Sequence, residues 1–298
     1  MKRVLSFLTA ALFCGSIFAQ EAPAAPAKPE SNWKRGILTQ IGFSQLSLTN
    51  WAAGGSGSVS LNAYLDIYAD YKKEKHLWAN DLQLGYGFIQ SFEDGYKKSD
   101  DRIIFDSKYG YKVSDRLYIS SVYNFRTQFA EGINASGNRV SDFFAPAYMS
   151  LGFGIDYQPY KNCSINFAPL TGKLVMVSDE ELRPLYGNAE DQFARFELGA
   201  QLKIDNIVEV QDFKVKSSLT LFSDYLNKPL NVKVGWDLNA DAKISRFFSV
   251  SLRTSLLYDD NIKSKRKKID AETVEMVPGV QFKELFSVGF SYTFGAAK

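Results

Sequence analysis

Apolar and polar side chains alternate without interruption over residues 59–71. One series consists of Val59, Leu61, Ala63, Leu65, Ile67, Ala69 and Tyr71, and the other of Ser60, Asn62, Tyr64, Asp66, Tyr68 and Asp70. A period of two predicts a β-strand with one apolar face and one polar face. At about 3.3 Å per residue and a tilt of about 45°, such a strand rises roughly 30 Å, which suits a lipid bilayer. Strands of soluble proteins are usually only about 5 to 6 residues long.

The same alternation recurs along the chain and predicts twelve strands. They cover residues 36–46, 59–71, 77–89, 102–112, 117–129, 145–157, 163–170, 193–205, 213–223, 232–244, 248–258 and 282–294. An even number of strands is typical of single-chain bacterial outer-membrane barrels. The pattern therefore predicts an all-β protein, an antiparallel up-and-down transmembrane β-barrel of about 12 strands.

The connections between these strands alternate in length. The short ones are residues 72–76, 113–116, 158–162, 206–212 and 245–247, and the long ones are residues 47–57, 90–101, 130–144, 171–192, 224–231 and 259–281. Outer-membrane barrels have short periplasmic turns and long extracellular loops. We therefore expect the short turns and both chain termini to lie in the periplasm of a Gram-negative bacterium.

The amount of apolar surface indicates which face meets lipid. In residues 232–244, Trp236 and Leu238 alternate with Asp237 and Asp241. Twelve apolar faces turned inward would exceed what a small interior holds, because a barrel of about eight strands already fills with side chains. We therefore expect the apolar faces to contact acyl chains and the polar faces to line the lumen. The alternative is a soluble periplasmic β-barrel binding protein with the apolar side chains inside.

The N-terminal residues are typical of a secretory signal. Lys2 and Arg3 precede an apolar run, and small residues end at Ala19. Residues 1–19 are predicted to be a signal peptide, and Cys14 leaves a lipoprotein anchor as the alternative. Residues 20–32, rich in Ala, Pro and Glu, are predicted to form a disordered periplasmic tether before an outer-membrane barrel domain at residues 33–298.

Charge and cysteine content exclude several functions. The chain has 35 Lys and Arg against 33 Asp and Glu, and without Lys2 and Arg3 the two counts are equal. A nucleic-acid partner is not expected, because such proteins need a basic excess. After removal of the signal, Cys163 is the remaining cysteine, so neither an internal disulfide nor a thiolate metal site is expected.

Charged residues of both signs fall on the polar faces of the predicted strands. The candidate lumen-lining residues are Arg102, Asp106, Lys108, Arg126, Asp156, Arg195, Glu197, Lys203, Asp237, Asp241 and Arg253. In a narrow tube these groups either pair and make the interior rigid or line a small polar passage. A small polar solute is therefore a candidate partner.

Catalytic signals are sparse, so no enzyme activity, cofactor or metal is expected. His76 is the single histidine and lies in a short charged turn, where it would need partner residues to act as a base or ligand. The hydrolase alternatives are a phospholipase, although the serine expected two residues after the histidine is replaced by Trp78, and a protease using the adjacent acids at 100–101 or 259–260. Such acids are more often solvated or loosely bind a divalent cation.

Two loop segments carry weaker signals. The glycines at 54, 55 and 57 lack the spacing of a phosphate-binding loop. A candidate extracellular basic patch consists of Lys263, Lys265, Arg266, Lys267 and Lys268. It could contact lipopolysaccharide phosphates or simply remain hydrated.

Seven short motifs resemble one known family. They are NWAAGG at 50–55, KYGYK at 108–112, FRTQF at 125–129, FAPAY at 144–148, PLTGK at 169–173, LFSDYL at 221–226 and VQFKELFSVGFSYTF at 280–294. The set resembles the DUF3078 family, uncharacterised secreted proteins of Bacteroidota. The resemblance implies a porin-like outer-membrane barrel of unknown activity and supplies no catalytic residues.

Taken with the absence of catalytic motifs, these patterns favour a non-enzymatic outer-membrane barrel. It would be either a narrow polar channel or a structural barrel that binds an unknown protein partner through its long loops. Outer-membrane lipid and lipopolysaccharide are its expected surroundings. An outer-membrane hydrolase and a soluble binding protein remain the alternatives.

Overall fold

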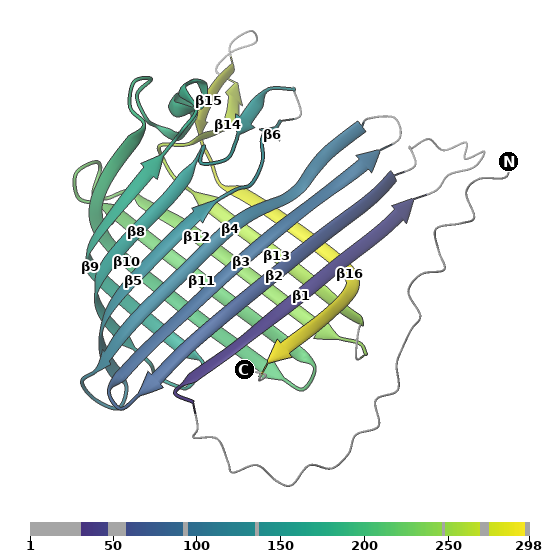
Figure 1. The fold of residues 1–298 in the computed structure, drawn as a ribbon. Helices are drawn as coiled ribbons and strands as arrows, with labels where there is room; N and C mark the ends of the chain where they lie inside the picture. The colour runs from purple at the N-terminus through teal and green to yellow at the C-terminus, as the bar shows by residue number, and fades with distance from the viewer. Residues whose placement is uncertain are drawn as a thin grey trace, which may run out of the picture. The chain divides into compact units, whose positions relative to one another are not determined.

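Twelve strands form a closed antiparallel barrel in the computed structural model of the chain (Figure 1). The model describes residues 31–46, 58–91, 95–134, 137–245, 248–268 and 274–295. The barrel strands are β1 (Trp33–Leu46), β2 (Ser58–Lys73), β3 (His76–Ser91), β4 (Gly95–Lys112), β5 (Leu117–Thr127), β8 (Ala147–Tyr157), β9 (Cys163–Met176), β10 (Ala194–Val210), β11 (Phe213–Asp224), β12 (Val232–Lys243), β13 (Phe248–Tyr258) and β16 (Gln281–Gly295). Each pairs with the barrel strands before and after it in the chain, and β1 pairs with β16 to close the ring. The predicted up-and-down barrel is confirmed.

All twelve predicted strands are present, but several are longer than the alternation indicates. β4 begins at Gly95 rather than near residue 102, since its pairing with β3 continues to the Ser91–Gly95 pair. β9 continues to Met176, and β10 continues to Val210. The predicted long loop at 90–101 and the predicted turn at 206–212 were therefore wrong in extent. Charged residues such as Lys97 and Asp100 looked like loop positions, yet their backbone continues the ladder.

The seam between the first and last strands is closed by close backbone contact. Gly36–Gly42 of β1 pairs with Gly289–Gly295 of β16. A Cβ atom on Gly289 would lie 2.3 Å from the carbonyl oxygen of Ile41, a separation that no side chain tolerates. Glycine at this position therefore permits the two strands to approach.

The exterior and interior of the barrel are inverted relative to a soluble protein. On the outside, Ile119 is 61% exposed and Phe286 is 63% exposed, whereas Glu197 is 0% and Asn166 is 1% exposed inside. In the strand with the clearest alternation, Asn62 is buried and its neighbour Ala63 is exposed. Apolar side chains pointing outward are what a lipid-facing barrel requires. The arrangement is the opposite of the one that a soluble β-barrel needs.

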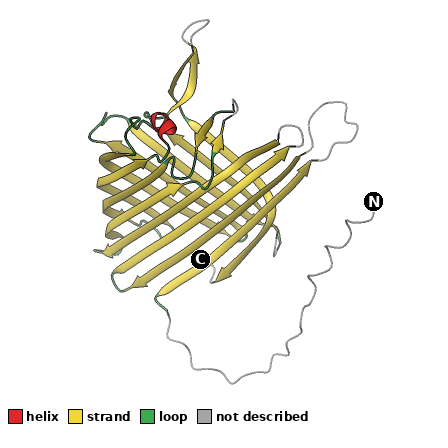
Figure 2. Cartoon of the chain, turned by 45° about the horizontal axis from the view of Figure 1, so that its top comes forward, coloured by secondary structure: helices red, strands yellow, loops and turns green. Residues whose placement is uncertain are grey.

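The connections differ at the two ends of the barrel. The end where β1 begins and β16 finishes carries short turns such as Glu74–Lys75, and we call it the turn end. The other end, the cap end, carries elements that the alternation did not predict (Figure 2). They are β6 (Gly132–Ile133), β7 (Arg139–Ser141), the 3₁₀ helix η1 (Glu180–Tyr186), β14 (Lys263–Lys268) and β15 (Val274–Pro278). No helix among the described residues is long and apolar enough to cross a membrane.

The loop cap, consisting of β6, β7 and η1, has its own stabilising contacts. Asp179 caps η1 by accepting from the Glu181 backbone N–H at 3.0 Å, and Gly187 ends the helix with φ of 78°. Arg139 of β7 forms an ion pair with Asp179 at 2.5 Å. The Tyr186 hydroxyl donates to the backbone oxygen of Val140 at 2.6 Å. Burial raises the pKa of Tyr186 to about 12.

Candidate functional site

The barrel interior is crossed by two ion pairs, which we call the central bridges. Arg126 of β5 binds Asp237 of β12 at 2.7 Å, and these strands lie on opposite sides of the barrel. Lys203 of β10 binds Asp106 of β4 at 2.8 Å. Both carboxylates also accept from neutral groups, Asp106 from Asn124 and Asp237 from Ser255. Paired charges with additional donors form a rigid polar network in a low-dielectric interior.

The central bridges lie between two cavities in the barrel interior. One, of about 210 Å³, extends toward the cap end and reaches Lys233 and Ile262. The other, of about 260 Å³, extends toward the turn end and reaches Asp70 and Asn206. Five residues line both cavities, namely Ile104, Asp106, Lys203, Ser218 and Asp237. Side chains of the bridges, rather than the strands themselves, therefore separate the two spaces.

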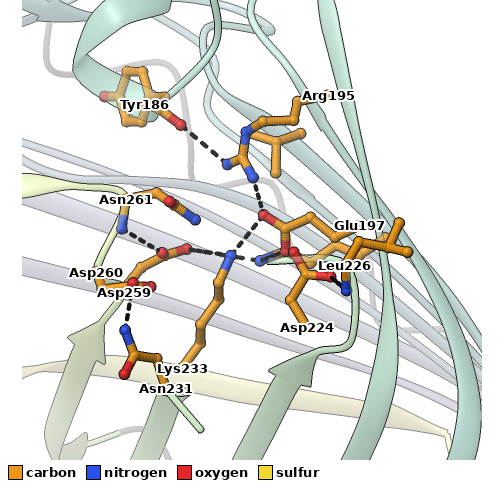
Figure 3. Close-up of polar contacts among 12 residues, drawn as sticks. Tyr186, Arg195, Glu197, Asp224, Leu226, Asn231, Lys233, Asp259, Asp260 and Asn261 are labelled. Atoms are coloured by element: carbon orange, nitrogen blue, oxygen red, sulfur yellow. Dashed lines mark hydrogen bonds and ion pairs between the residues drawn. The ribbon is translucent and has the colours of Figure 1, made fainter. Parts of the chain in front are cut away.

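Five charged residues meet at the cap end of the interior, and we call them the cap-side cluster: Lys173, Arg195, Glu197, Lys233 and Asp259. Figure 3 labels the last four of them. Glu197 is fully buried and accepts from Lys233 at 2.6 Å and from Arg195. Lys233 also lies 3.4 Å from Asp259. The cluster holds three cations and two carboxylates.

The cap-side cluster also contacts the loop cap. Arg195 donates to the backbone oxygen of Tyr186 at 3.2 Å, at the end of η1. Asp259 accepts from the backbone N–H of Asn261 at 2.9 Å (Figure 3). The loop cap is therefore connected to the interior charges directly through Arg195.

A different network occupies the side of the lumen nearer the turn end. Lys108 of β4 binds Asp156 of β8 at 3.2 Å and donates to Ser164 at 2.6 Å. Asp156 also accepts from Ser164 at 2.5 Å and from Gln158 at 2.8 Å. Here one cation faces one carboxylate, and hydroxyl and amide groups supply the remaining hydrogen bonds.

A third group of contacts surrounds Tyr64. The guanidinium of Arg253 lies 4.4 Å from the centre of its ring, and that of Arg102 lies 5.2 Å away. Arg253 also donates to Gln40 at 2.8 Å, and Arg102 forms an ion pair with Asp100 at 3.1 Å. Tyr64 and Gln40 thus hold the Arg102 and Arg253 side chains close to the inner wall of the barrel.

Each of the eleven candidate lumen-lining residues takes part in an ion pair. The pairs are Arg102–Asp100, Lys203–Asp106, Lys108–Asp156, Arg126–Asp237, Arg195–Glu197 and Arg253–Asp241. Sequence reasoning missed Lys173 and Lys233 as site residues and named Asp259 only as one of the adjacent acids at 259–260, not as a lumen residue. Lys233 lies on the polar face of a predicted strand, so the alternation could have identified it. Lys173 and Asp259 fall in segments predicted to be loops.

The other candidates from the sequence do not assemble into a catalytic site. His76 hydrogen-bonds to the Tyr109 hydroxyl at 2.7 Å on an exposed surface. Of the adjacent acids, Asp100 pairs with Arg102 and Lys283, whereas Asp101 pairs with Lys98. Within the described parts of the chain, no three His, Cys, Asp or Glu residues are grouped to hold a metal ion.

The acids at 259–260 likewise point to different partners. Asp259 belongs to the cap-side cluster, and Asp260 accepts from Asn231 at 2.8 Å. The backbone of the basic run forms β14, whereas the side chains of Lys263, Lys265, Arg266, Lys267 and Lys268 lie outside the described residues.

Fold and interior together define a transmembrane β-barrel with an apolar exterior and a polar, charge-paired lumen. Residues 43–133 match the family model described as "Protein of unknown function (DUF3078)". The match confirms the resemblance over those residues, which include three of the seven motifs. No curated protein matches the chain.

Several solved structures resemble the fold at low sequence identity. An outer membrane channel, COG4313, from Pseudomonas putida F1 is 11% identical with a TM-score of 0.37, covering 93% of this chain and 99% of that one. The translocator domain of the autotransporter NalP from Neisseria meningitidis is 12% identical with a TM-score of 0.38, covering 89% of each chain. The monoaromatic hydrocarbon channel CymD is 12% identical with a TM-score of 0.32, covering 91% of this chain and 90% of that one.

Proposed function

We propose that the protein is an outer-membrane channel for small polar solutes and that the central bridges form its constriction. The observation that carries this proposal is the pair of interior cavities that share lining residues at the bridges. A solute passing along the lumen needs to displace two cross-barrel ion pairs but no strand. Charged side chains that exchange partners with a passing polar solute are a common form of selectivity element.

Planar-bilayer recordings with the full-length protein test this function. The wild-type protein should give small, discrete conductance steps. The double variant Arg126→Ala, Asp237→Ala removes both members of one bridge and avoids an unpaired charge, so its unitary conductance should rise about twofold or more if the bridge limits passage. The control Lys112→Met, Asp115→Asn removes a pair with a 2.9 Å contact at an exposed turn and should leave conductance unchanged. Equal conductance in the wild-type protein and the double-alanine variant would overturn the proposed constriction.

A structural, partner-binding barrel is the second candidate, and the loop cap favours it. Arg139 pairs with Asp179 at 2.5 Å, Glu181 at 3.3 Å and Asp142 at 3.4 Å, so the cap presents a defined surface. If this is the function, neither the wild-type protein nor the double-alanine variant should give conductance steps in planar bilayers. The channel function predicts conductance in both.

We further propose that the turn end and both termini face the periplasm, with residues 1–19 removed as a signal peptide and residues 20–32 acting as a tether. The short turns at one end support this orientation. Cysteine introduced at the exposed turn residue Asp115 should resist a membrane-impermeant thiol reagent in intact cells, whereas one at the exposed cap residue Glu181 should react. The reverse labelling pattern would contradict the orientation, and the mass of the mature N-terminus tests the cleavage site.

A further inference from the structure

The cap-side cluster contains one more cation than it has carboxylates to pair with. Lys173, Arg195 and Lys233 surround Glu197 and Asp259. Glu197 is fully buried, and Asp259 and Lys233 are nearly so. A buried uncompensated charge is costly, and a bound counter-anion would reduce that cost.

Lys173 forms the longest ion pairs in the cluster. Its ammonium lies 3.5 Å from Glu197 and 3.9 Å from Asp259. Its remaining neighbours include the rings of Tyr148 and Phe222, each 5.5 Å from the ammonium nitrogen. A lysine has three donors, so this ammonium retains the capacity to bind an additional anion.

The cavity beside Lys173 is partly apolar. Lys173 and Lys233 line it together with Tyr148, Phe222 and a group of aliphatic side chains. Those aliphatic side chains are Ile104, Leu257 and Ile262. At about 210 Å³, the space can hold several water molecules or one small organic molecule. Its walls therefore offer two ammonium groups and a surface for a hydrocarbon or aromatic body.

We propose that the cap-side cavity binds a small organic monocarboxylate, with the carboxylate at Lys173 and Lys233 and the apolar body against Phe222 and Tyr148. Ligand sites commonly combine an apolar wall with a few polar groups that fix orientation. The single excess positive charge of the cluster matches one carboxylate. The inference names a solute class for the channel and thus rests on the proposed function, but binding can be measured without conductance.

Calorimetric titration of the purified full-length protein in detergent tests this site, with benzoate as the probe and benzamide as its neutral counterpart. Benzoate should bind, and benzamide should bind at least about tenfold more weakly, because it lacks the negative charge that strengthens a hydrogen bond from an ammonium group. Equal binding of the two compounds, or no binding of benzoate, would overturn the proposal.

Two lumen variants form a matched pair. Lys173→Met removes the cation at the site and should weaken benzoate binding about tenfold or more. Lys216→Met removes a cation that lines the other cavity and should leave benzoate affinity within about twofold. Equal weakening in the two variants would show a general field effect and would contradict a site at Lys173.

A third variant should strengthen benzoate binding, whereas Lys173→Met should weaken it. Asp259→Asn raises the cationic excess without removing a ligand-binding ammonium, so it should tighten benzoate binding several-fold. Weaker binding in this variant would contradict the charge argument even if Lys173→Met failed to fold. If benzoate binds but the protein gives no conductance in the bilayer, the channel function is wrong and the binding site stands. If the protein conducts but does not bind benzoate, the binding site is wrong and the channel function stands.

Discussion

The two halves of the lumen differ in how their charges are balanced. The cap-side cavity is lined by four cations and three carboxylates: Arg126, Lys173, Lys203 and Lys233 with Asp106, Asp237 and Asp259. The turn-side cavity is lined by four cations and five carboxylates: Arg102, Lys108, Lys203 and Lys216 with Asp70, Asp81, Asp106, Asp205 and Asp237. The lining charges are therefore in positive excess on the cap side of the central bridges and in negative excess on the turn side. A tube with nearly zero net charge can still present opposite electrostatic preferences at its two ends.

The largest expected difference between the halves concerns stability. Glu197→Gln leaves three cap-side cations with one carboxylate and should lower the free energy of unfolding by about 3–5 kcal/mol, the usual cost of breaking a buried ion pair. Asp156→Asn, on the turn side, leaves Lys108 with Ser164 as a hydrogen-bond partner and should cost about 1–3 kcal/mol. Urea titrations of the folded barrel in detergent give both values. Equal losses would show that the two networks are energetically alike.

A charge exchange at the boundary between the halves should have an intermediate effect. Arg126→Asp alone places two carboxylates face to face and should raise unitary conductance and destabilise the barrel. Adding Asp237→Arg restores a pair of opposite charges across the same gap. A double-mutant cycle on unfolding free energies should yield a coupling of about 0.5–3 kcal/mol, and conductance should return toward the wild-type value. Additive effects would mean that the bridge does not act as a unit.

The smallest expected effect lies in the loop cap. Because burial raises the pKa of Tyr186 to about 12, the unfolded cap loses its tyrosine proton before the folded cap does. The resulting stabilisation is complete below about pH 10, the ordinary pKa of tyrosine, and disappears as pH rises through 12. Hydrogen exchange in residues 180–186, corrected for intrinsic rates, should therefore accelerate several-fold between pH 10 and 12.

Tyr186→Phe provides the control for this pH effect. The variant loses the hydrogen bond to Val140 but has no ionisable hydroxyl, so its corrected exchange should be faster at all pH values and independent of pH in this range. Acceleration of the same size in both proteins would assign the pH response to another group.

The wall of the barrel could be predicted from the sequence, because the alternation shows directly which side chains face outward and which face the interior. The interior partners could not. Arg126 and Asp237 are 111 positions apart and on different polar faces, and the pairing depends on the stagger of strands across a closed ring. Lys173 was missed because the pattern of β9 becomes irregular after Leu170, although the strand continues to Met176. The cap elements were missed because β6, β7 and η1 are two, three and seven residues long, too short to show a period.

The ring is joined where its first and last strands pair, between Gly36–Gly42 of β1 and Gly289–Gly295 of β16. The ring cannot close before β16 is available to pair with β1. Until then, both terminal strands present unsatisfied backbone groups that could pair with a neighbouring chain. Ring closure satisfies the backbone groups of both terminal strands at once, and the absence of a side chain at Gly289 allows the close approach that closure needs.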